Sequence, residues 1–285
     1  LKCIKQGKLT SSAFLNEYLF FIILMILTAI PVGFFAGLFG IGGGLITVPF
    51  LFFIFASLDI NQEYLMHLAI GTSFSIIIPT SIVSVLTHKK HNSVDFSVIK
   101  TYGIFVVIGV FCGTIIASLL DTKSLLLFFT IVVYCLGAYL LNIQEKTNKI
   151  KANFNLAPKI ILGTISGLIS STMGIGGAVM NVPVLRYFGY PINKAIGSAA
   201  AIGFIVALFA VIGFLFSGSY LSANLPLSIG FINIPAFLIF VPITTIMAKV
   251  GANTTHKVNK SKLQRMFGIF LYIVGTIFLY RYLNI

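Results

Sequence analysis

The sequence predicts an all-α integral membrane protein with about eight to ten hydrophobic segments in two repeated halves. Only 9% of the 285 residues are charged and 58% are hydrophobic, whereas soluble domains carry about a quarter charged residues. Apolar runs recur at the length of a membrane-spanning helix, and one ordered set of glycine motifs occurs twice. We therefore expect lipid to cover most of the surface of this chain.

The hydrophobic segments are defined by length, because a helix needs about 20 apolar residues to cross the hydrocarbon core. The first run follows three lysines and is longer than the apolar region of a cleaved signal peptide, so we interpret it as a retained span. Regions 44–57 and 157–188 adjoin glycine clusters and are predicted to belong to broken helices. The uninterrupted runs are 16–37, 65–87, 96–120, 124–141, 195–217, 225–248 and 266–283.

One polar stretch divides the chain. Residues 142–156 contain Glu145 together with three lysines and four asparagines, which makes this the longest polar stretch between predicted spans. We therefore predict a first membrane repeat at 1–141, a basic linker at 142–156 and a second membrane repeat at 157–285.

The two halves carry the same features in the same order. A single glycine cluster arises easily by chance, but a series of matched motifs along nearly the whole chain predicts an internal repeat, as in many secondary transporters. The second half departs from the first at Ala178, which matches Gly44, and at Ala199, which matches Ser73. The matched stretches are Gly37–Gly43 with Gly167–Gly177, Val48-Pro49 with Val182-Pro183, Ala69–Ser73 with Ala195–Ala199, and Gly113 with Gly251.

Loop charge predicts that the repeats are inverted. The loop 88–95 holds two lysines, and its counterpart 218–224 has no charge. The loop 58–64 is acidic, whereas its counterpart 186–194 holds Arg186 and Lys194. Because cytoplasmic loops collect Lys and Arg, matched loops with opposite bias are expected on opposite sides of the membrane. The basic N-terminus fits less well, since strict inversion places it outside.

Composition also argues against several other classes of protein. The chain has 19 Lys and Arg against 6 Asp and Glu, but the positive residues lie in short loops and not in a nucleic-acid groove. Cys112 and Cys135 lie in apolar runs and are interpreted as packing residues. His88 and His91 are interpreted as part of a solvated basic loop. We expect no metal, no cofactor and no nucleic-acid partner.

The glycine clusters are the candidate site. Glycine destabilises a helix by about 1 kcal/mol relative to alanine, and unpaired backbone groups are tolerated inside a membrane only beside protein or a water-filled cavity. A helix that starts after such a break presents free N–H groups and a positive dipole end, which favours an anion. The predicted substrate-binding residues are Gly42, Gly43, Gly44, Thr47, Thr72, Ser73, Gly176, Gly177, Asn181 and Ser198.

Helix packing is the competing interpretation of these glycines. Gly33 with Gly37 and Gly163 with Gly167 have the small-xxx-small spacing of close helix contacts, so packing is favoured for these four. Binding is favoured for the two clusters that precede a polar residue and a Val-Pro pair. The glycine order fits neither the dinucleotide fingerprint nor a P-loop.

Carboxylates are absent from the predicted span centres. Asp and Glu occur at positions 17, 59, 63, 95, 121 and 145, near predicted ends or loops, and a proton relay needs a titratable group within the bundle. His67 is interpreted as an interfacial residue. Arg186 and Lys194 are expected at the inner mouth. The membrane potential drives anions outward by about 2.3 kcal/mol per charge per 100 mV, so export needs no built-in proton carrier.

The paired motifs resemble the sulfite exporter TauE/SafE family of membrane permeases. The resemblance implies eight or more spans, a multi-pass location in the bacterial inner membrane, and transport of small sulfur-containing anions such as sulfite and organosulfonates. It rests on Gly37–Gly44 with Val48-Pro49, Ala69–Ser73, Met173–Gly177 with Val182-Pro183, His88–Asp95 and Gly230–Pro235.

The predicted function is therefore a membrane transporter for a small anion, with the lipid bilayer as its surroundings. A passive anion channel is the first alternative, distinguished by ohmic current instead of saturable flux. An intramembrane enzyme is the second, but it needs an Asp pair, a Ser/His pair or a metal-binding His pair inside the spans. The predicted spans contain no such pair, and His67 has no evident nucleophile beside it. The oligomeric state is not predicted.

Overall fold

The computed structural model describes residues 11–39, 42–58, 60–142, 156–221, 225–254 and 260–284. Within these ranges, eight helices are long and apolar enough to cross a membrane. This confirms the prediction of an all-α, multi-pass membrane protein. The predicted linker lies almost wholly outside the described residues, as do Gly40, Ile41 and Cys3.

The first part of the chain forms four long helices and one short one, close to the predicted runs. The short helix α2 follows directly on the first glycine cluster, and a 3₁₀ turn leads into α3. The elements are α1 (Ser11–Phe39), α2 (Gly44–Ser57), η2 (Gln62–Tyr64), α3 (Leu65–Lys90), α4 (Phe96–Leu119) and α5 (Thr122–Asn142).

The second part of the chain repeats this order of long and short helices. Region 157–188 is split at its glycine cluster, as predicted, into a long and a short helix. The elements are α6 (Leu156–Met173), α7 (Ala178–Tyr187), α8 (Ile192–Tyr220), β1 (Ser228–Ile229), β2 (Ile232–Asn233), α9 (Ile234–Thr254) and α10 (Lys260–Leu283).

The predicted run 225–248 is wrong at its start, where the chain forms a hairpin instead of helix. Strands β1 and β2 pair antiparallel around Gly230, whose positive φ of 55° suits a turn. The helix begins only at Ile234. Asn233 caps it, because its side-chain oxygen accepts a hydrogen bond from the Ala236 amide (3.0 Å). The prediction failed here because residues 225–233 are mostly apolar although they form a turn and a helix cap.

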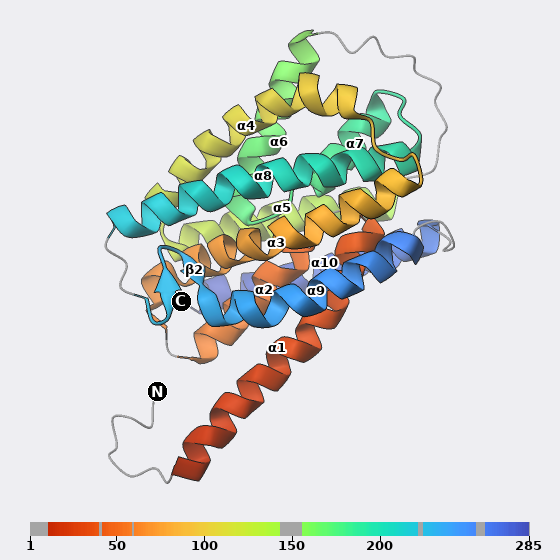
Figure 1. Ribbon diagram of the computed structural model, residues 1–285. Helices are drawn as coiled ribbons and strands as arrows, with labels where there is room; N and C mark the ends of the chain where they lie inside the picture. The colour runs from red at the N-terminus through yellow and green to blue at the C-terminus, as the bar shows by residue number, and fades with distance from the viewer. Residues whose placement is uncertain are drawn as a thin grey trace.

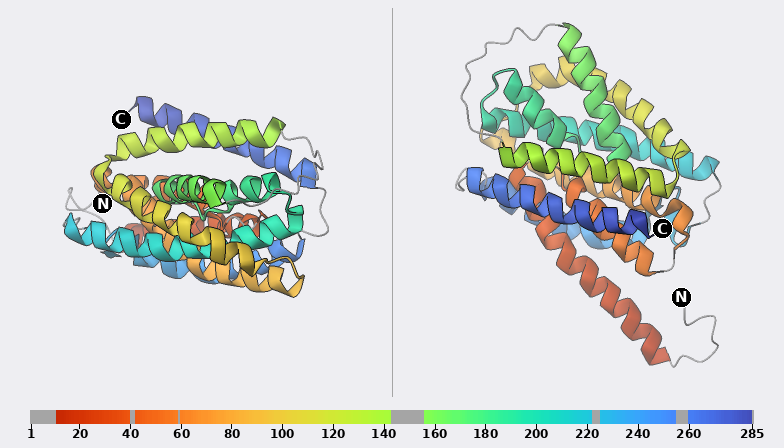
Figure 2. Two further views of the ribbon diagram at one scale, coloured as in Figure 1. Left: turned by 90° about the horizontal axis from the view of Figure 1, so that it is seen from above. Right: turned by 180° about the vertical axis from the view of Figure 1, so that it is seen from behind.

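Helix contacts relate the two parts of the chain. Helix α4 packs along α6, and α1 packs along α9; α3 contacts α8, and α5 contacts α10. The views from above and from behind show α5 and α10 side by side along one face of the bundle (Figure 2). Each of these pairs joins a helix of the first part of the chain to a helix of the second, so the two parts build the core together.

Close approach of two helix pairs depends on glycine. Gly37 of α1 lies against the backbone of α9, and Gly167 of α6 lies against the backbone of α4; at both positions a Cβ atom would overlap a carbonyl oxygen. Gly33 and Gly163 lie in the same two contacts. The packing interpretation of these four glycines is confirmed, and it matches the small-residue contacts of membrane helices.

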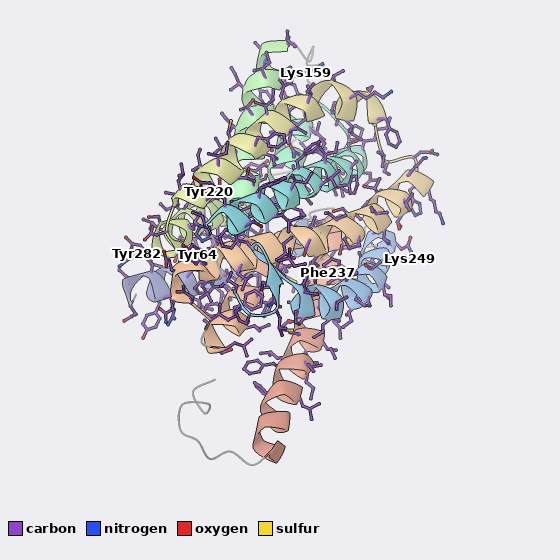
Figure 3. The ribbon with its side chains drawn as sticks, turned by 60° about the vertical axis from the view of Figure 1, so that its left-hand side comes forward. Tyr64, Lys159, Tyr220, Phe237, Lys249 and Tyr282 are labelled. Atoms are coloured by element: carbon purple, nitrogen blue, oxygen red, sulfur yellow. The ribbon has the colours of Figure 1, made fainter. Side chains whose placement is uncertain are left out.

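The two ends of the bundle differ in charge. We call the end where α3 and α9 finish and α8 begins the basic end; it lies to the right in Figure 1. The opposite end carries the β-hairpin, and we call it the hairpin end. Figure 3 shows Tyr64, Tyr220 and Tyr282 at the hairpin end and Lys249 at the other. The described cations of the basic end are Lys89, Lys90, Lys100, Lys159, Arg186, Lys194, Lys249 and Arg265.

The outer surface between these ends is apolar. Large hydrophobic side chains such as Leu119, Phe216 and Ile246 are exposed on the long helices, and such side chains contact lipid in a membrane. Cys112 and Cys135 are also exposed, which corrects the prediction that they pack inside the bundle.

Candidate functional site

Two short helices start at left-handed glycines, as the glycine clusters predicted. Gly43 caps α2 with φ 85°, and Gly177 caps α7 with φ 64°. Residues with a Cβ atom rarely adopt this conformation, so glycine is needed at both caps. Gly42 and Gly174 also have positive φ values. We call residues 42–44 the first break and residues 174–177 the second break.

The two breaks meet inside the bundle. A Cβ atom on Gly44 would overlap the Gly174 carbonyl oxygen and would lie 3.0 Å from the Ile175 Cα atom. Ser73 of α3 donates a hydrogen bond to the same Gly174 carbonyl (3.1 Å). Helix α3 therefore joins the start of α2 to the second break, and the N-termini of two short helices point their dipoles into one region.

Thr47 and Asn181 occupy equivalent positions and make equivalent bonds. The Thr47 hydroxyl donates to the Gly43 carbonyl (3.0 Å), and the Asn181 amide donates to the Gly177 carbonyl (2.7 Å). Both side chains thus donate a hydrogen bond to the carbonyl of the last glycine in their own break. In this conformation they support the left-handed caps from within the first helical turn.

Asn181 is the centre of a larger hydrogen-bond network. Its side-chain oxygen accepts from the Tyr102 hydroxyl (2.8 Å) and from the Ser166 hydroxyl (2.9 Å). Sequence reasoning missed Tyr102 and Ser166, because neither lies in a glycine cluster or in a stretch matched in the other half. This network fills the side-chain space of the second break and ties α7 to α4 and α6.

Thr72 and Ser198 hold the starts of two other helices. The Thr72 hydroxyl accepts from the Asn233 amide (2.9 Å), and the Ser198 hydroxyl accepts from the Asp95 amide (2.9 Å). Asp95 in turn caps α4 by accepting from the Ser97 amide (3.0 Å). The hydrogen bond from the Ser97 hydroxyl holds the pKa of Asp95 below its ordinary value.

All ten predicted site residues are buried, including Thr47, Thr72, Ser73, Asn181 and Ser198 with no exposed surface. This conformation is closed over the breaks. The Ile46 and Thr47 amides donate to the Gly43 carbonyl (2.9 Å each), whereas no acceptor among the described residues takes the amides of Gly44 and Leu45. These two N–H groups belong to the first turn of α2, whose amides have no partner within their own helix.

Helix α3 carries buried polar groups that sequence reasoning missed. Ser81 and Ser84 are each 1% exposed, and neither hydroxyl has a hydrogen-bond partner in the described part of the chain. Their spacing from each other and from His88 places all three on one helical face. That spacing was a signal in the sequence that could have identified them.

Two histidine interpretations need correction. His88 is not in a solvated loop: it lies in the last turn of α3, is 1% exposed, and places Nε2 3.4 Å from the Gly37 carbonyl. His67 lies near the start of α3, as predicted, but it is 2% exposed and packs against protein, with Nε2 2.9 Å from the Ala117 carbonyl. Within the described residues, no group of three or more His, Cys, Asp or Glu side chains is arranged to hold a metal.

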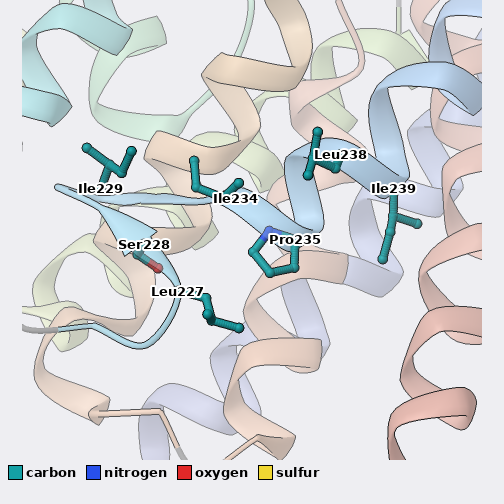
Figure 4. Close-up of a pocket in the computed structure, with 7 residues that line it drawn as sticks. All are labelled: Leu227, Ser228, Ile229, Ile234, Pro235, Leu238 and Ile239. Carbon is teal, nitrogen blue, oxygen red and sulfur yellow. The ribbon is translucent and has the colours of Figure 1, made fainter.

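A surface pocket of about 630 Å³ lies beside the hairpin, away from both breaks (Figure 4). Its lining is apolar apart from one serine, so it offers nothing to bind a charged solute. The pocket therefore lies on the surface of the hairpin end and is separate from the candidate site. It is lined by Leu227, Ser228, Ile229, Ile234, Pro235, Leu238 and Ile239.

Known proteins similar to this chain are membrane transporters by description. Residues 25–278 match the family model described as Sulfite exporter TauE/SafE. A Haemophilus influenzae protein named "Probable membrane transporter protein" is 34% identical over 90% of this chain and 97% of its own length. A protein with the same description from Methanocaldococcus jannaschii is 29% identical over 92% and 97%. No solved structure matches this chain.

Proposed function

This chain belongs to the sulfite exporter TauE/SafE family of membrane transporters, and on that premise we propose that it carries a small sulfur-containing oxyanion, such as sulfite or an organosulfonate, out across the cell (inner) membrane. The single observation behind the anion is the meeting of two short helices whose N-termini start at left-handed glycines inside the bundle. Helix N-termini favour anions through their free N–H groups and their dipoles.

The proposed binding residues are those at the two breaks and on the helices beside them. Glycine lets the backbone approach a ligand closely. The amides of Gly44 and Leu45, which have no acceptor within the described residues, support this role for the first break. The full proposed set is Gly42, Gly43, Gly44, Thr47, Thr72, Ser73, Gly176, Gly177, Asn181 and Ser198.

We further propose that the two halves are inverted repeats, with the basic end facing the cytoplasm. The matched helix pairs support this arrangement, and the basic end fits the side that collects Lys and Arg. A solute released toward the hairpin end then moves outward. The described acidic side chains, Glu63, Asp95 and Asp121, lie at the ends of spans, so no described carboxylate offers a proton relay inside the bundle, and we propose that the membrane potential drives export. The buried titratable groups of α3 are His67 and His88.

Burial of the breaks favours a carrier over a channel. A passive channel keeps a continuous water-filled path, whereas the residues of both breaks are buried in this conformation. A carrier instead alternates between closed and open forms around a central site. The carrier interpretation predicts flux that saturates with solute concentration.

Flux measurements in proteoliposomes test the proposal. Vesicles containing the full chain are loaded with sulfite, thiosulfate, a sulfonate or a non-sulfur anion, and efflux is followed under an imposed membrane potential. We expect saturable efflux of sulfite or the sulfonate that increases with potential. Flux that follows a pH gradient but ignores the potential, or flux confined to the non-sulfur anion, contradicts the proposal.

A further inference from the structure

Helices α3 and α8 occupy equivalent positions but differ in polarity. Gly71 of α3 and Gly197 of α8 each lie against the loop that precedes α9 or α4, and this contact aligns the two helices. Beyond these glycines, four buried positions of α3 that carry a serine hydroxyl or an imidazole match alanine or phenylalanine in α8. The matched pairs are Ser73 with Ala199, Ser81 with Ala207, Ser84 with Ala210, and His88 with Phe214.

Ser81 lies directly beside the first break. A Cβ atom on Gly42 would lie 3.2 Å from the Ser81 hydroxyl oxygen and 2.8 Å from the Ile77 side chain. The same Ile77 side chain lies 2.9 Å from the position of a Cβ atom on Gly44. Ile77 thus covers the glycine face of the first break, and the Ser81 hydroxyl sits at its edge.

The two breaks differ in the pairing of the side chains at their glycines, although Ser170 of α6, which leads into the second break, also has an unpaired hydroxyl. Ser81 and Ser84 have no hydrogen-bond partner among the described residues, although each is 99% buried. Buried polar groups in native structures are nearly always paired, so an unpaired one calls for an explanation such as a missing ligand. At the second break the polar side chain, Asn181, already bonds Tyr102, Ser166 and Gly177.

A polar face leads from the first break to the basic end. Ser84 lies one turn beyond Ser81 on α3, and His88 lies one turn beyond Ser84. The helix ends at Lys89 and Lys90, whose side chains are exposed. An anion attracted by these lysines would therefore follow hydroxyl and imidazole groups to the first-turn amides of α2.

The equivalent path toward the hairpin end is closed by aromatic rings. Phe214, which matches His88, has its ring centroid 6.0 Å from that of Phe74 and 6.4 Å from that of Phe231. Ala207 and Ala210 offer no hydrogen bond on the way. In this conformation the path beside α8 excludes a charged solute.

We infer that the oxyanion enters from the basic end along α3 and takes its side-chain hydrogen bonds from Ser81 and Ser84 at the first break, with the amides of Gly44 and Leu45 completing the site. This inference rests on the proposed function and narrows it to one half of the molecule. Because hydroxyl and amide donors carry no full charge, they bind an anion without holding it as tightly as a buried arginine would. The second break serves as the framework.

Cysteine labelling tests the path without relying on transport. In a chain with Cys3, Cys112 and Cys135 replaced by alanine, single cysteines are introduced as Ser81→Cys, Ser84→Cys and, as matched controls in α8, Ala207→Cys and Ala210→Cys. The probe is (2-sulfonatoethyl) methanethiosulfonate, a membrane-impermeant anion, applied in inside-out vesicles. Lys90→Cys, at an exposed position, gives the rate for free access.

We expect the α3 cysteines to react at least tenfold faster than their α8 counterparts. Equal rates in the two helices, no reaction at either α3 cysteine, or faster reaction in α8 overturns the inference. If the α3 cysteines react as expected but the wild-type protein carries none of the anions tested, the proposed function fails while the path stands. If sulfite is carried but the α3 cysteines do not react, the path fails and the function stands.

Hydroxyl removal tests the ligand role itself. Ser81→Ala is expected to raise the KM for sulfite efflux at least fivefold at unchanged protein level. Ser170→Ala is the matched control at the second break, because Ser170 of α6 is also 1% exposed with an unpaired hydroxyl and its carbonyl accepts from the Ile175 amide (3.0 Å). A KM unchanged by Ser81→Ala, or raised equally by Ser170→Ala, contradicts the assignment.

Discussion

The two breaks have the same backbone and different surroundings. Both begin a short helix at a left-handed glycine, and both return a side chain from the first turn to that glycine's carbonyl. The second break adds Tyr102 and Ser166 to a closed network around Asn181, whereas the first lies beside unpaired serines of α3. Two helix starts of the same kind can thus differ in function: the side chains at the second break are paired with protein, and we propose that those at the first break bind the ligand.

Substitution of the cap glycines is expected to have the largest effect. Gly43→Leu forces a side chain into the left-handed region, and its Cβ atom would lie 3.1 Å from the side chains of Ala36 and Val32. A strained residue of this kind costs about 1–3 kcal/mol. We expect sulfite efflux to fall at least tenfold for Gly43→Leu, and for Gly177→Leu at the second break.

These two variants test whether the breaks are needed at all. Efflux is compared at equal amounts of reconstituted protein, with Gly103→Leu as the control, because glycine 103 has only side-chain neighbours at 3.7 Å or beyond. Unchanged efflux in both cap variants would remove the breaks from the transport site.

The Asn181 network is expected to contribute more to stability than the single Thr47 bond. Asn181→Leu removes the acceptor that the Tyr102 and Ser166 hydroxyls share. The Tyr102 hydroxyl still reaches the Leu162 carbonyl (3.3 Å), so the cost expected is that of the unpaired Ser166 hydroxyl, about 1–3 kcal/mol. Thr47→Val removes one local bond, for which about 1 kcal/mol or less is expected. Equilibrium unfolding in mixed micelles gives both values. A larger loss for Thr47→Val would reverse the comparison between the breaks.

The smallest expected effect is a change in how stability depends on pH. It concerns the caps of α4 and α9, which occupy matching places in the two halves. Asp95 caps α4 and titrates, whereas Asn233 caps α9 and does not. The Ser97 hydroxyl lowers the pKa of Asp95 below its ordinary value of 3.8. A lowered pKa means stability that is complete above the unfolded pKa and is lost as pH falls through the folded pKa.

We therefore expect the wild-type protein to lose stability below about pH 4 in part through this cap. Asp95→Asn should reduce the slope of thermal stability against pH in that range, while Asn233→Ser, which keeps an uncharged cap, should leave the slope unchanged. An identical slope in the wild-type protein and Asp95→Asn would show that the α4 cap does not contribute.

Much of the fold could be predicted because length and apolarity decide it. Runs of about 20 apolar residues have one stable arrangement in lipid, and the glycine clusters marked both breaks. The hairpin at 228–233 was missed because its residues are as apolar as a span, and only Gly230 and Asn233 signal the turn and the cap.

The partners of the site could not be predicted in the same way. Thr72 and Ser198 were placed near the breaks by their position after a glycine, but their hydroxyls hold the amides of Asn233 and Asp95. Such contacts join residues more than 100 positions apart, and local sequence carries no trace of them. Ser81 and Ser84 were visible as a helical face, yet their burial without partners appears only in three dimensions.

The most direct measurement is the position of a bound anion. Selenite resembles sulfite and contains a strong anomalous scatterer, so a structure of the full chain with selenite would locate it from the selenium signal. The account predicts one site at the start of α2, within hydrogen-bond distance of the Ser81 hydroxyl and the Gly44 amide. Selenium bound beside Asn181 at the second break, or only among the lysines of the basic end, would contradict it.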